Sequence, residues 1–409
     1  MSDANSNVDA FQRRIPTLDG WRAVAILLVL FDHGADAWLR AGLALTGHAG
    51  AFESDSYAWL KDPIGRAGVH LFFALSGYLI TRRLLEEESR FGVISVGGFY
   101  LRRLLRIQPA AIVFLLVVGA LGLAGVLAVS GPGWVAALLA YANFAMGSQT
   151  WYTGHFWSLA VEEHFYLLWP LVFVLLGPRR RLAGSLAIVL LFGVWLGIVV
   201  RYHVAYSPYM WVRSDIEGSW VMWGCVAALA QASPAGARLI GLLSRPGISL
   251  VALPLAAFSV LYSDLDWKIV YGATVLTAAA TPLLLIGTMR RPRGWLGAVL
   301  ELQPLAWLGR ISYSVYLWQA IFFVWDDERS TVLGALQSPP WRFMLTLACA
   351  AGSYYGIEKP VIRLGARMLG RRAPARPPER SPEAPRRRMR QVRRRTLATR
   401  ASAGRHSRR

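Results

Sequence analysis

Cysteine is scarce in this chain of 409 residues, which has two in all. Cys225 and Cys349 both lie inside apolar stretches, where a thiol behaves as a small buried hydrophobic side chain. Two separate cysteines exclude a disulfide framework and form no zinc-binding pattern. The sequence therefore predicts no metal site.

Acidic residues are also few, since 24 Asp and Glu stand against 44 Lys and Arg and the net charge is +20. Most of the excess lies at the end of the chain, where 371–409 hold fifteen arginines against Glu379 and Glu383, a charge of +13. This Pro- and Arg-rich tail, taken as 366–409, is predicted to be disordered and to contact anionic lipid headgroups at the cytoplasmic face rather than nucleic acid. Residues 1–14 are predicted to be a short disordered cytoplasmic N-terminus.

Apolar sequence, by contrast, is abundant, at 55% of the residues. Runs of about 17–22 apolar residues recur and match the thickness of a bilayer core. Residues 15–365 are therefore predicted to form an all-α, polytopic transmembrane helical bundle. The expected spans, ten in number and approximate at their ends, are 19–39, 67–85, 109–129, 157–177, 182–203, 216–232, 247–263, 269–288, 311–326 and 341–358.

One further apolar stretch, 134–146, decides the orientation. If this stretch crosses the bilayer, the cluster Arg179–Arg181 falls on the outside. If it does not cross, every basic cluster lies on one side, which the positive-inside rule identifies as the cytoplasm. We therefore expect 130–156 to lie across the outer face and both termini to be cytoplasmic.

Arg22 and His33 interrupt the first apolar run. A central arginine in an inserted helix costs roughly 2.5–3.5 kcal/mol. The two residues are separated by about three helical turns, so they share nearly one helix face and lie about 16 Å apart along the axis. Such side chains are tolerated when they face protein or water, and they commonly serve chemistry.

Three arginines precede the third span at its cytoplasmic mouth: Arg102, Arg103 and Arg106. Arg102 and Arg106 are four residues apart and share a helix face. They are either a topology signal that anchors lipid headgroups or a clamp for a polyphosphate, because guanidinium forks match phosphate oxygens. Composition alone leaves both interpretations open.

Glu162, Glu163 and His164 are consecutive inside the fourth span. Three ionisable residues among bulky apolar ones predict a functional cavity. Either glutamate is a candidate to orient His33 as a general base, although the sequence does not say whether they meet.

Ser76 precedes Gly77 inside the second span but lacks the G-x-S-x-G frame of a hydrolase nucleophile. We expect this pair to let helices pack closely, with the hydroxyl bonded across the interface. Tyr316 is expected either to line a sugar-sized cleft or to pack between helices.

Arg213 and Asp215 flank the outer start of the sixth span and are expected to form a local ion pair. Glu358 and Pro360 are expected to mark the end of the last span, because proline stops a helix. Glu358 would then need a basic partner there.

Together these segments resemble the acyltransferase-3 family of integral membrane acyltransferases. Members of that family acylate carbohydrates such as O-antigen, exopolysaccharide, Nod factor, peptidoglycan or macrolide sugars. The matching pieces follow the family order: Leu18-Asp19-Gly20-Trp21-Arg22 with His33, Gly68 through Ile80, Arg102 through Pro109, Trp157 through Tyr166, Ile311 through Trp318 and Glu358-Lys359-Pro360.

The resemblance implies that cytoplasmic acyl-CoA, expected to be acetyl-CoA, is a co-substrate and that no cofactor is resident. Its phosphates would bind the three arginines of the third span. His33 would act as general base or transient acyl carrier, Glu162 would orient it, and Arg22 would hold the pantetheine or phosphate part. These three are the predicted catalytic residues.

The acceptor implied by the resemblance is a carbohydrate or glycoconjugate at the outer face of a bacterial inner membrane. Ser76, Trp157, Tyr316 and Arg213 are the predicted substrate-binding residues. Gln319 stands where relatives often have histidine, so we expect no catalytic role for it.

A transporter or flippase of a glycolipid or lipid-linked sugar is the alternative, with the intramembrane Arg, His and Glu residues as a relay. The sequence shows no clear internal repeat and no paired broken helices, which such transporters often have. The acyltransferase is therefore the preferred interpretation.

Overall fold

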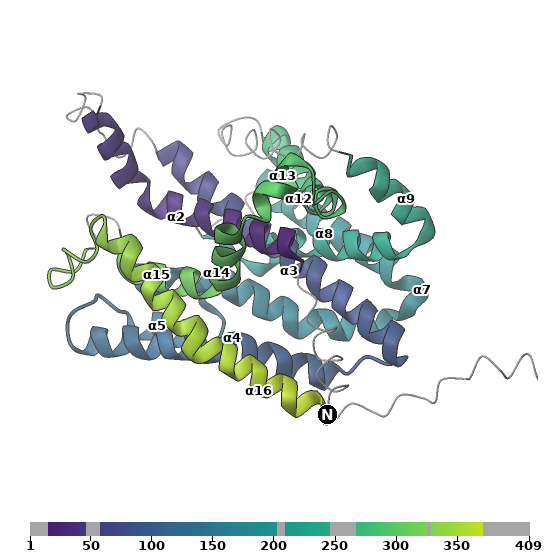
Figure 1. Ribbon diagram of the computed structural model, residues 1–409. Coiled ribbons are helices and arrows are strands. Elements are labelled where there is room, and N and C mark those ends of the chain that lie inside the picture. The colour runs from purple at the N-terminus through teal and green to yellow at the C-terminus, as the bar shows by residue number, and fades with distance from the viewer. Residues whose placement is uncertain (1–14, 46–57, 203–208, 246–266, 325–328, 371–409) are drawn as a thin grey trace, which may run out of the picture. The chain divides into compact units, whose positions relative to one another are not determined.

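Every element that the computed structural model describes is a helix, as the all-α prediction requires (Figure 1). The described residues are 15–45, 58–202, 209–245, 267–324 and 329–370, and they contain no strand. The predicted N-terminus 1–14, the span 247–263 and the basic residues 371–409 lie outside the described residues.

The longer helices overlap the predicted spans that fall within these ranges. They are α2 (Pro16–Leu45), α3 (Ala58–Phe91), α4 (Val96–Leu123), α7 (Phe156–Tyr202), α8 (Ser214–Ala232), α12 (Trp267–Arg290), α14 (Gln303–Phe322) and α15 (Trp341–Ser353). The shorter helices are α5 (Gly131–Leu138), α6 (Trp151–Gly154), α9 (Pro234–Leu243), α13 (Trp295–Leu300) and α16 (Lys359–Gly370).

The long helix α7 is two helices joined at Gly177. Its φ of 63° and ψ of 164° lie outside the helical region, in a conformation that glycine adopts without penalty. Pro178 follows at once and fits the first turn of the next helix. The break therefore falls where the sequence predicted a gap between two spans, 157–177 and 182–203.

Three helical stretches of the described residues are long and apolar enough to cross a bilayer: Ile64–Phe91, Val96–Leu123 and Trp151–Tyr202. The pair Met210–Ala232 and Pro234–Leu243, bent by 118°, makes a fourth if it counts as one broken span. The chain thus has several apolar helices, and the number of ten spans stays a prediction.

The connection between α4 and α7 contains no helix long enough to span. α5 has 8 residues, which at 1.5 Å per residue is about 12 Å against a bilayer core of about 30 Å. The indole of Trp134 on α5 donates a 2.8 Å hydrogen bond to the carbonyl of Leu115 on α4. This short helix packed on α4 fits the expectation that 134–146 does not cross.

The expectation that Pro360 ends the last helix was wrong. The five-residue π-helical turn Tyr354–Glu358 follows α15, and α16 continues to Gly370. Pro360 is the second residue of α16, where the missing N–H and the fixed φ are tolerated. Glu358 accepts a hydrogen bond from the Ser314 hydroxyl and interacts electrostatically with Arg106, so it has a basic partner as expected.

The crossing of α3 and α8 confirms the close packing expected at Ser76-Gly77. A Cβ on Gly77 would lie 1.9 Å from the carbonyl oxygen of Val221, and one on Gly224 would lie 2.3 Å from that of Ala74. The two backbones approach so closely that only glycine fits at either position.

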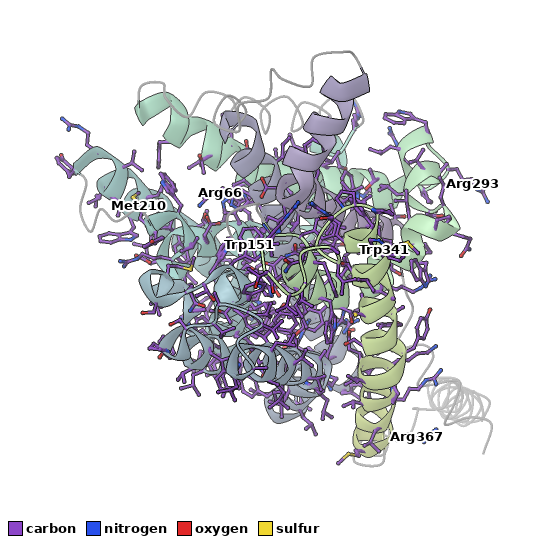
Figure 2. The ribbon with its side chains drawn as sticks, turned by 90° about the vertical axis from the view of Figure 1, so that its left-hand side faces the viewer. Arg66, Trp151, Met210, Arg293, Trp341 and Arg367 are labelled. Atoms are coloured by element: carbon purple, nitrogen blue, oxygen red, sulfur yellow. The ribbon has the colours of Figure 1, made fainter. Side chains whose placement is uncertain are left out.

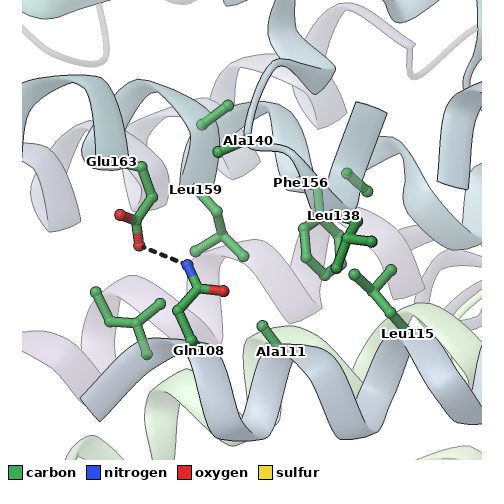
Figure 3. Close-up of a pocket in the computed structure, with 11 residues that line it drawn as sticks. Gln108, Ala111, Leu115, Leu138, Ala140, Phe156, Leu159 and Glu163 are labelled. Carbon is green, nitrogen blue, oxygen red and sulfur yellow. Dashed lines mark hydrogen bonds between the residues drawn. The ribbon is translucent and has the colours of Figure 1, made fainter. Parts of the chain in front are cut away.

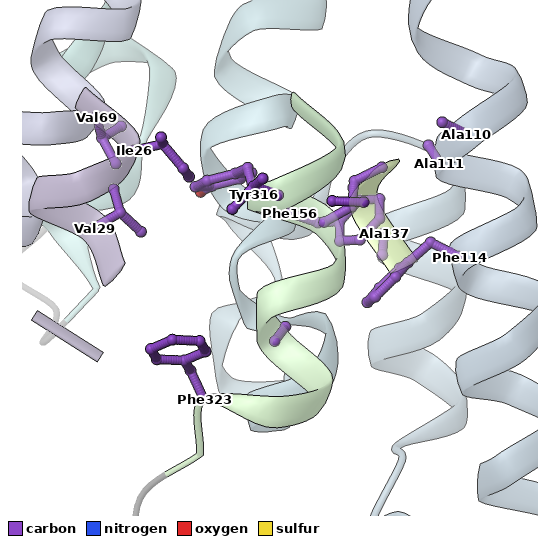
Figure 4. Packing of buried hydrophobic residues seen from close by; sticks show 14 of the residues in the cluster. Ile26, Val29, Val69, Ala110, Ala111, Phe114, Ala137, Phe156, Tyr316 and Phe323 are labelled. Carbon is purple, nitrogen blue, oxygen red and sulfur yellow. The ribbon is translucent and has the colours of Figure 1, made fainter. Parts of the chain in front are cut away.

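A continuous apolar core joins the helices around α14 (Figure 4). It unites Ile26 of α2, Val69 of α3, Phe114 of α4, Phe156 of α7 and Tyr316 of α14, all buried. Segments almost three hundred residues apart therefore pack on one another and bring their polar side chains together.

Candidate active site

His33 of α2 is held by Gln319 of α14. The imidazole Nδ1 lies 2.7 Å from the amide oxygen of Gln319, which is fully buried. An amide oxygen only accepts hydrogen bonds, so this contact places the ring proton on Nδ1 and leaves Nε2 as the basic nitrogen. Trp151, labelled in Figure 2 and partly buried, packs against the ring with centroids 5.0 Å apart. Gln319 therefore has a positioning role that the sequence analysis did not expect.

The carboxylate beside His33 belongs to Asp32. Its Oδ2 lies 3.7 Å from Nε2 of His33, too far for a good hydrogen bond but close enough to stabilise an imidazolium. Both side chains are mostly shielded from solvent. The carboxylate in contact with His33 among the described residues is thus that of its chain neighbour, and the predicted role of Glu162 toward His33 stays a prediction.

Glu162 instead forms a polar cluster between α7 and α3. Its two carboxylate oxygens accept hydrogen bonds from the Ser76 hydroxyl, at 2.6 Å, and from the Tyr166 hydroxyl, at 2.7 Å. Tyr166 lies one turn after Glu162, and its hydroxyl is also 3.2 Å from that of Ser76. The cation Arg103 lies over the Tyr166 ring, with its guanidinium carbon 4.7 Å from the centroid.

Arg22, Arg83, Arg103 and Arg106 form a group of guanidinium side chains from three helices, α2, α3 and α4. Their positive charges repel one another. Arg22 forms an ion pair with Asp19, at 3.1 Å, and this is the ion pair that these four side chains form in the described part of the chain. Glu162, Glu163 and Glu358 offset part of this charge at longer range, without an ion pair to these arginines within 4 Å among the described residues. The group, termed here the arginine cluster, is suited to bind phosphates.

Arg102 differs from its neighbours because it has a carboxylate partner. Its guanidinium lies 2.7 Å from Glu87, which also accepts a 3.0 Å hydrogen bond from the backbone N–H of Ser95 at the start of α4. This contact ties α3 to the N-terminus of α4. Arg102 thus already has a carboxylate partner, and its predicted role in binding the phosphates of CoA stays a prediction.

Tyr316 of α14 contacts the start of α7, and Trp157 of α7 contacts α3. The Tyr316 hydroxyl donates to the carbonyl of His155 at 3.0 Å and lies 2.5 Å from the Ser158 hydroxyl. Trp157 packs edge-on against Phe73, with ring centroids 6.1 Å apart. Their predicted contact with a substrate stays a prediction.

Glu163 faces a hollow between α4, α5 and α7 (Figure 3). It accepts a 3.3 Å hydrogen bond from Gln108, and these two are the polar residues of an otherwise apolar lining. The empty space amounts to about 340 Å³ and is partly open. Leu159 and Phe156 point into it from α7.

Arg213 forms the local ion pair that was expected. Its guanidinium contacts Asp215 at 3.0 and 3.1 Å, and Asp215 also accepts from the indole of Trp195. The side chain also lies over the ring of Phe144. These contacts explain Arg213 as a structural residue, and its predicted role toward a substrate stays a prediction.

Sequence reasoning missed Asp32, Arg83 and Gln319 as members of the site. Asp32 stands next to His33, and that adjacency was an available signal. Arg83 follows an apolar run, as any arginine that anchors a helix end does, so its position alone did not single it out. Gln319 is 286 residues from His33, and no pattern within one helix relates them.

A helical membrane chain that holds a histidine beside a buried glutamine and an aspartate, and a cluster of arginines, is consistent with a membrane acyltransferase. A sequence model described as an acyltransferase domain matches residues 15–357. The chain therefore belongs to the acyltransferase-3 family.

Several characterised or named relatives are similar to the chain. The O-acetyltransferase OatA of Staphylococcus aureus (strain NCTC 8325 / PS 47) is 29% identical over 381 residues, covering 86% of this chain and 58% of that protein. The putative peptidoglycan O-acetyltransferase YrhL of Bacillus subtilis is 29% identical over 399 residues, covering 88% and 57%. The peptidoglycan O-acetyltransferase OatA of Listeria monocytogenes is 26% identical over 386 residues, covering 87% and 57%. The chain thus spans less than three fifths of the length of these relatives, and no solved structure matches it.

Proposed function

We propose that this protein is an integral membrane O-acetyltransferase that uses cytoplasmic acetyl-CoA to acetylate a hydroxyl group of a carbohydrate outside the cytoplasm. Family membership and the printed names of the relatives support the reaction class and an acceptor related to peptidoglycan. The arginine cluster and the His33 site support binding of the donor phosphates and of the acceptor at two different places in the helical bundle.

The arginine cluster binds the phosphates of CoA in this proposal. Arg103 and Arg106 form no carboxylate ion pair within 4 Å among the described residues, so their guanidinium N–H groups retain donors for phosphate oxygens. Arg22 lies in the same cluster and on the same helix as His33, about 16 Å away along the axis. An extended pantetheine arm has a comparable reach and would bring the thioester from the cluster toward His33.

His33 removes the proton from the acceptor hydroxyl. Nε2 takes the proton, the hydroxyl oxygen bonds to the thioester carbonyl carbon, and the C–S bond breaks. The departing CoA thiolate takes a proton from the imidazolium, which returns His33 to its starting state. Asp32 stabilises the imidazolium between these steps, and Gln319 keeps the ring in the required tautomer.

The contact of His33 with Gln319 and Asp32 is the observation on which this proposal chiefly rests. It is tested with purified protein in nanodiscs, given radiolabelled acetyl-CoA and muropeptides released from peptidoglycan by lysozyme. We expect label to move to the muropeptides, and His33→Ala to reduce transfer at least a thousandfold. Tyr202→Ala, which truncates an exposed ring at the end of α7, is the control and is expected to stay within threefold of wild type.

Full activity of His33→Ala would refute the role of the base. Label that stays on the protein and depends on His33 would replace direct transfer by an acyl-histidine intermediate. Absence of CoA release from folded wild-type protein would refute the transferase and favour the transporter.

A further inference from the structure

His155, at the junction of α6 and α7, is a buried histidine whose ring nitrogens have no hydrogen-bond partner among the described residues. It is 8% exposed, and neither Nδ1 nor Nε2 forms a hydrogen bond within the described part of the chain. Burying two polar nitrogens without partners costs free energy, and native proteins seldom leave such groups unsatisfied. The ring therefore has capacity for a partner that is not part of the described chain.

The described neighbours of His155 form hydrogen bonds with its backbone and none with its ring nitrogens. The hydroxyls of Tyr316 and Ser158 both donate to the carbonyl oxygen of His155, at 3.0 and 3.3 Å. Aromatic rings stand around the imidazole, with centroids 5.4 Å away at Phe114 and 5.5 Å away at Tyr316. The residue is thus positioned by its main chain, while its side chain is enclosed by aromatic rings.

The imidazole of His155 belongs to the neighbourhood of the proposed base. Trp151, whose ring centroid lies 5.0 Å from that of His33, precedes His155 by one helical turn. The amide of Gln319, whose oxygen holds His33, has an Nε2 with no hydrogen-bond partner among the described residues, although the side chain is fully buried. The indole nitrogen of Trp318 is likewise unpartnered there, and its ring packs edge-on against Phe114 at 5.7 Å.

Unpartnered donors and acceptors among aromatic rings match the chemistry of a sugar. Sugar hydroxyls both donate and accept hydrogen bonds, and the C–H faces of the ring pack on aromatic side chains. Acyl-CoA phosphates are better matched by the arginine cluster. The polar and aromatic residues around His155 are therefore suited to the acceptor, and the arginine cluster is suited to the donor.

We propose that His155, with the side-chain amide of Gln319 and the indole of Trp318, forms the subsite that binds the acceptor hydroxyl groups beside His33. This inference rests on the proposed function and assigns a carbohydrate-binding role to His155. The hydroxyl that reacts lies toward Nε2 of His33, and the neighbouring hydroxyls fill the hydrogen-bonding capacity of His155. A bound sugar would form hydrogen bonds with these groups and so remove the free-energy cost of burying them without partners.

The test compares steady-state constants for two substrates, acetyl-CoA and lysozyme-released muropeptides, in nanodiscs. His155→Phe keeps an aromatic ring of similar size and removes both nitrogens. We expect its KM for muropeptides to rise about tenfold or more, with its KM for acetyl-CoA within twofold of wild type. His155→Asn keeps part of the hydrogen-bonding capacity, so its KM for muropeptides is expected to lie between those of wild type and His155→Phe. Tyr202→Phe, which removes a polar atom from an exposed ring at the end of α7, is the control and should leave both KM values unchanged.

A KM for muropeptides that is unchanged in His155→Phe overturns the inference while leaving the proposed function intact. An equal rise in both KM values also overturns it, since the residue would then act on the fold or the donor. If wild type releases CoA but transfers nothing to muropeptides, the proposed acceptor fails and the inference fails with it. Thermal unfolding of each variant in the same nanodiscs separates loss of binding from loss of folding.

Discussion

Replacing Asp32 by asparagine tests whether this carboxylate stabilises the protonated form of His33. The two groups are 3.7 Å apart. At an effective dielectric constant of about 20–40, two unit charges at this distance attract each other by about 2–4 kcal/mol. Since about 1.4 kcal/mol corresponds to a tenfold change in rate, the transfer rate is expected to fall by about thirty- to thousandfold. The neutral amide keeps the shape of the side chain, so the loss reports on charge.

The assay is transfer of radiolabelled acetyl from acetyl-CoA to muropeptides by the purified variant in nanodiscs, under saturating donor. The matched control is Glu86→Gln on α3, since Glu86 is solvent-exposed and pairs with Arg82 through a 2.8 Å contact. We expect this control to stay within twofold of wild type, because exposed ion pairs contribute little. A rate for Asp32→Asn within threefold of wild type would show that the carboxylate does not stabilise the imidazolium.

The remaining predictions concern the arginine cluster and the packing of the helices. The double variant Arg103→Ala with Arg106→Ala is expected to raise the KM for acetyl-CoA at least tenfold, because hydrogen bonds to charged groups contribute about 1.5–3 kcal/mol each; Arg82→Ala is the control, and an unchanged KM would return the cluster to a topology signal. Gly224→Ala is expected to lower the midpoint of thermal unfolding in detergent by several degrees, because the new Cβ would lie 2.3 Å from a backbone oxygen and overpacking costs about 1–3 kcal/mol. Gly272→Ala, where an added Cβ meets nothing within 4 Å, should leave the midpoint nearly unchanged, and equal midpoints for both variants would contradict the close crossing of α3 and α8.

Residues that act within one helix were predictable. Arg22 and His33 stand out because a charged group is expensive inside an apolar run, and helical periodicity alone places them on one face. Glu162 was identified by the same reasoning, and its partner Tyr166 is one turn away on the same helix. The break at Gly177 was predictable because a glycine followed by proline interrupts two apolar runs.

Partnerships between helices were not predictable from these patterns. Glu162 was expected beside His33, but its hydrogen bonds join α7 to Ser76 of α3. Gln319 was dismissed because it does not titrate, yet its amide oxygen sets the orientation of His33. Arg83 looked like an anchoring arginine until the packing of α3 against α2 and α4 brought it to the cluster.

The sequence by itself determined the helical class, the membrane character of the apolar runs and the residues whose burial costs free energy, because each depends on local composition and the period of one helix. Only the tertiary structure decided which of those residues meet. Helices approach where small residues allow it, as at Gly77 and Gly224, and that choice depends on contacts between segments about 150 residues apart. Pairing in the site follows from that packing, since a histidine and a glutamine on different helices meet only once their backbones are brought together.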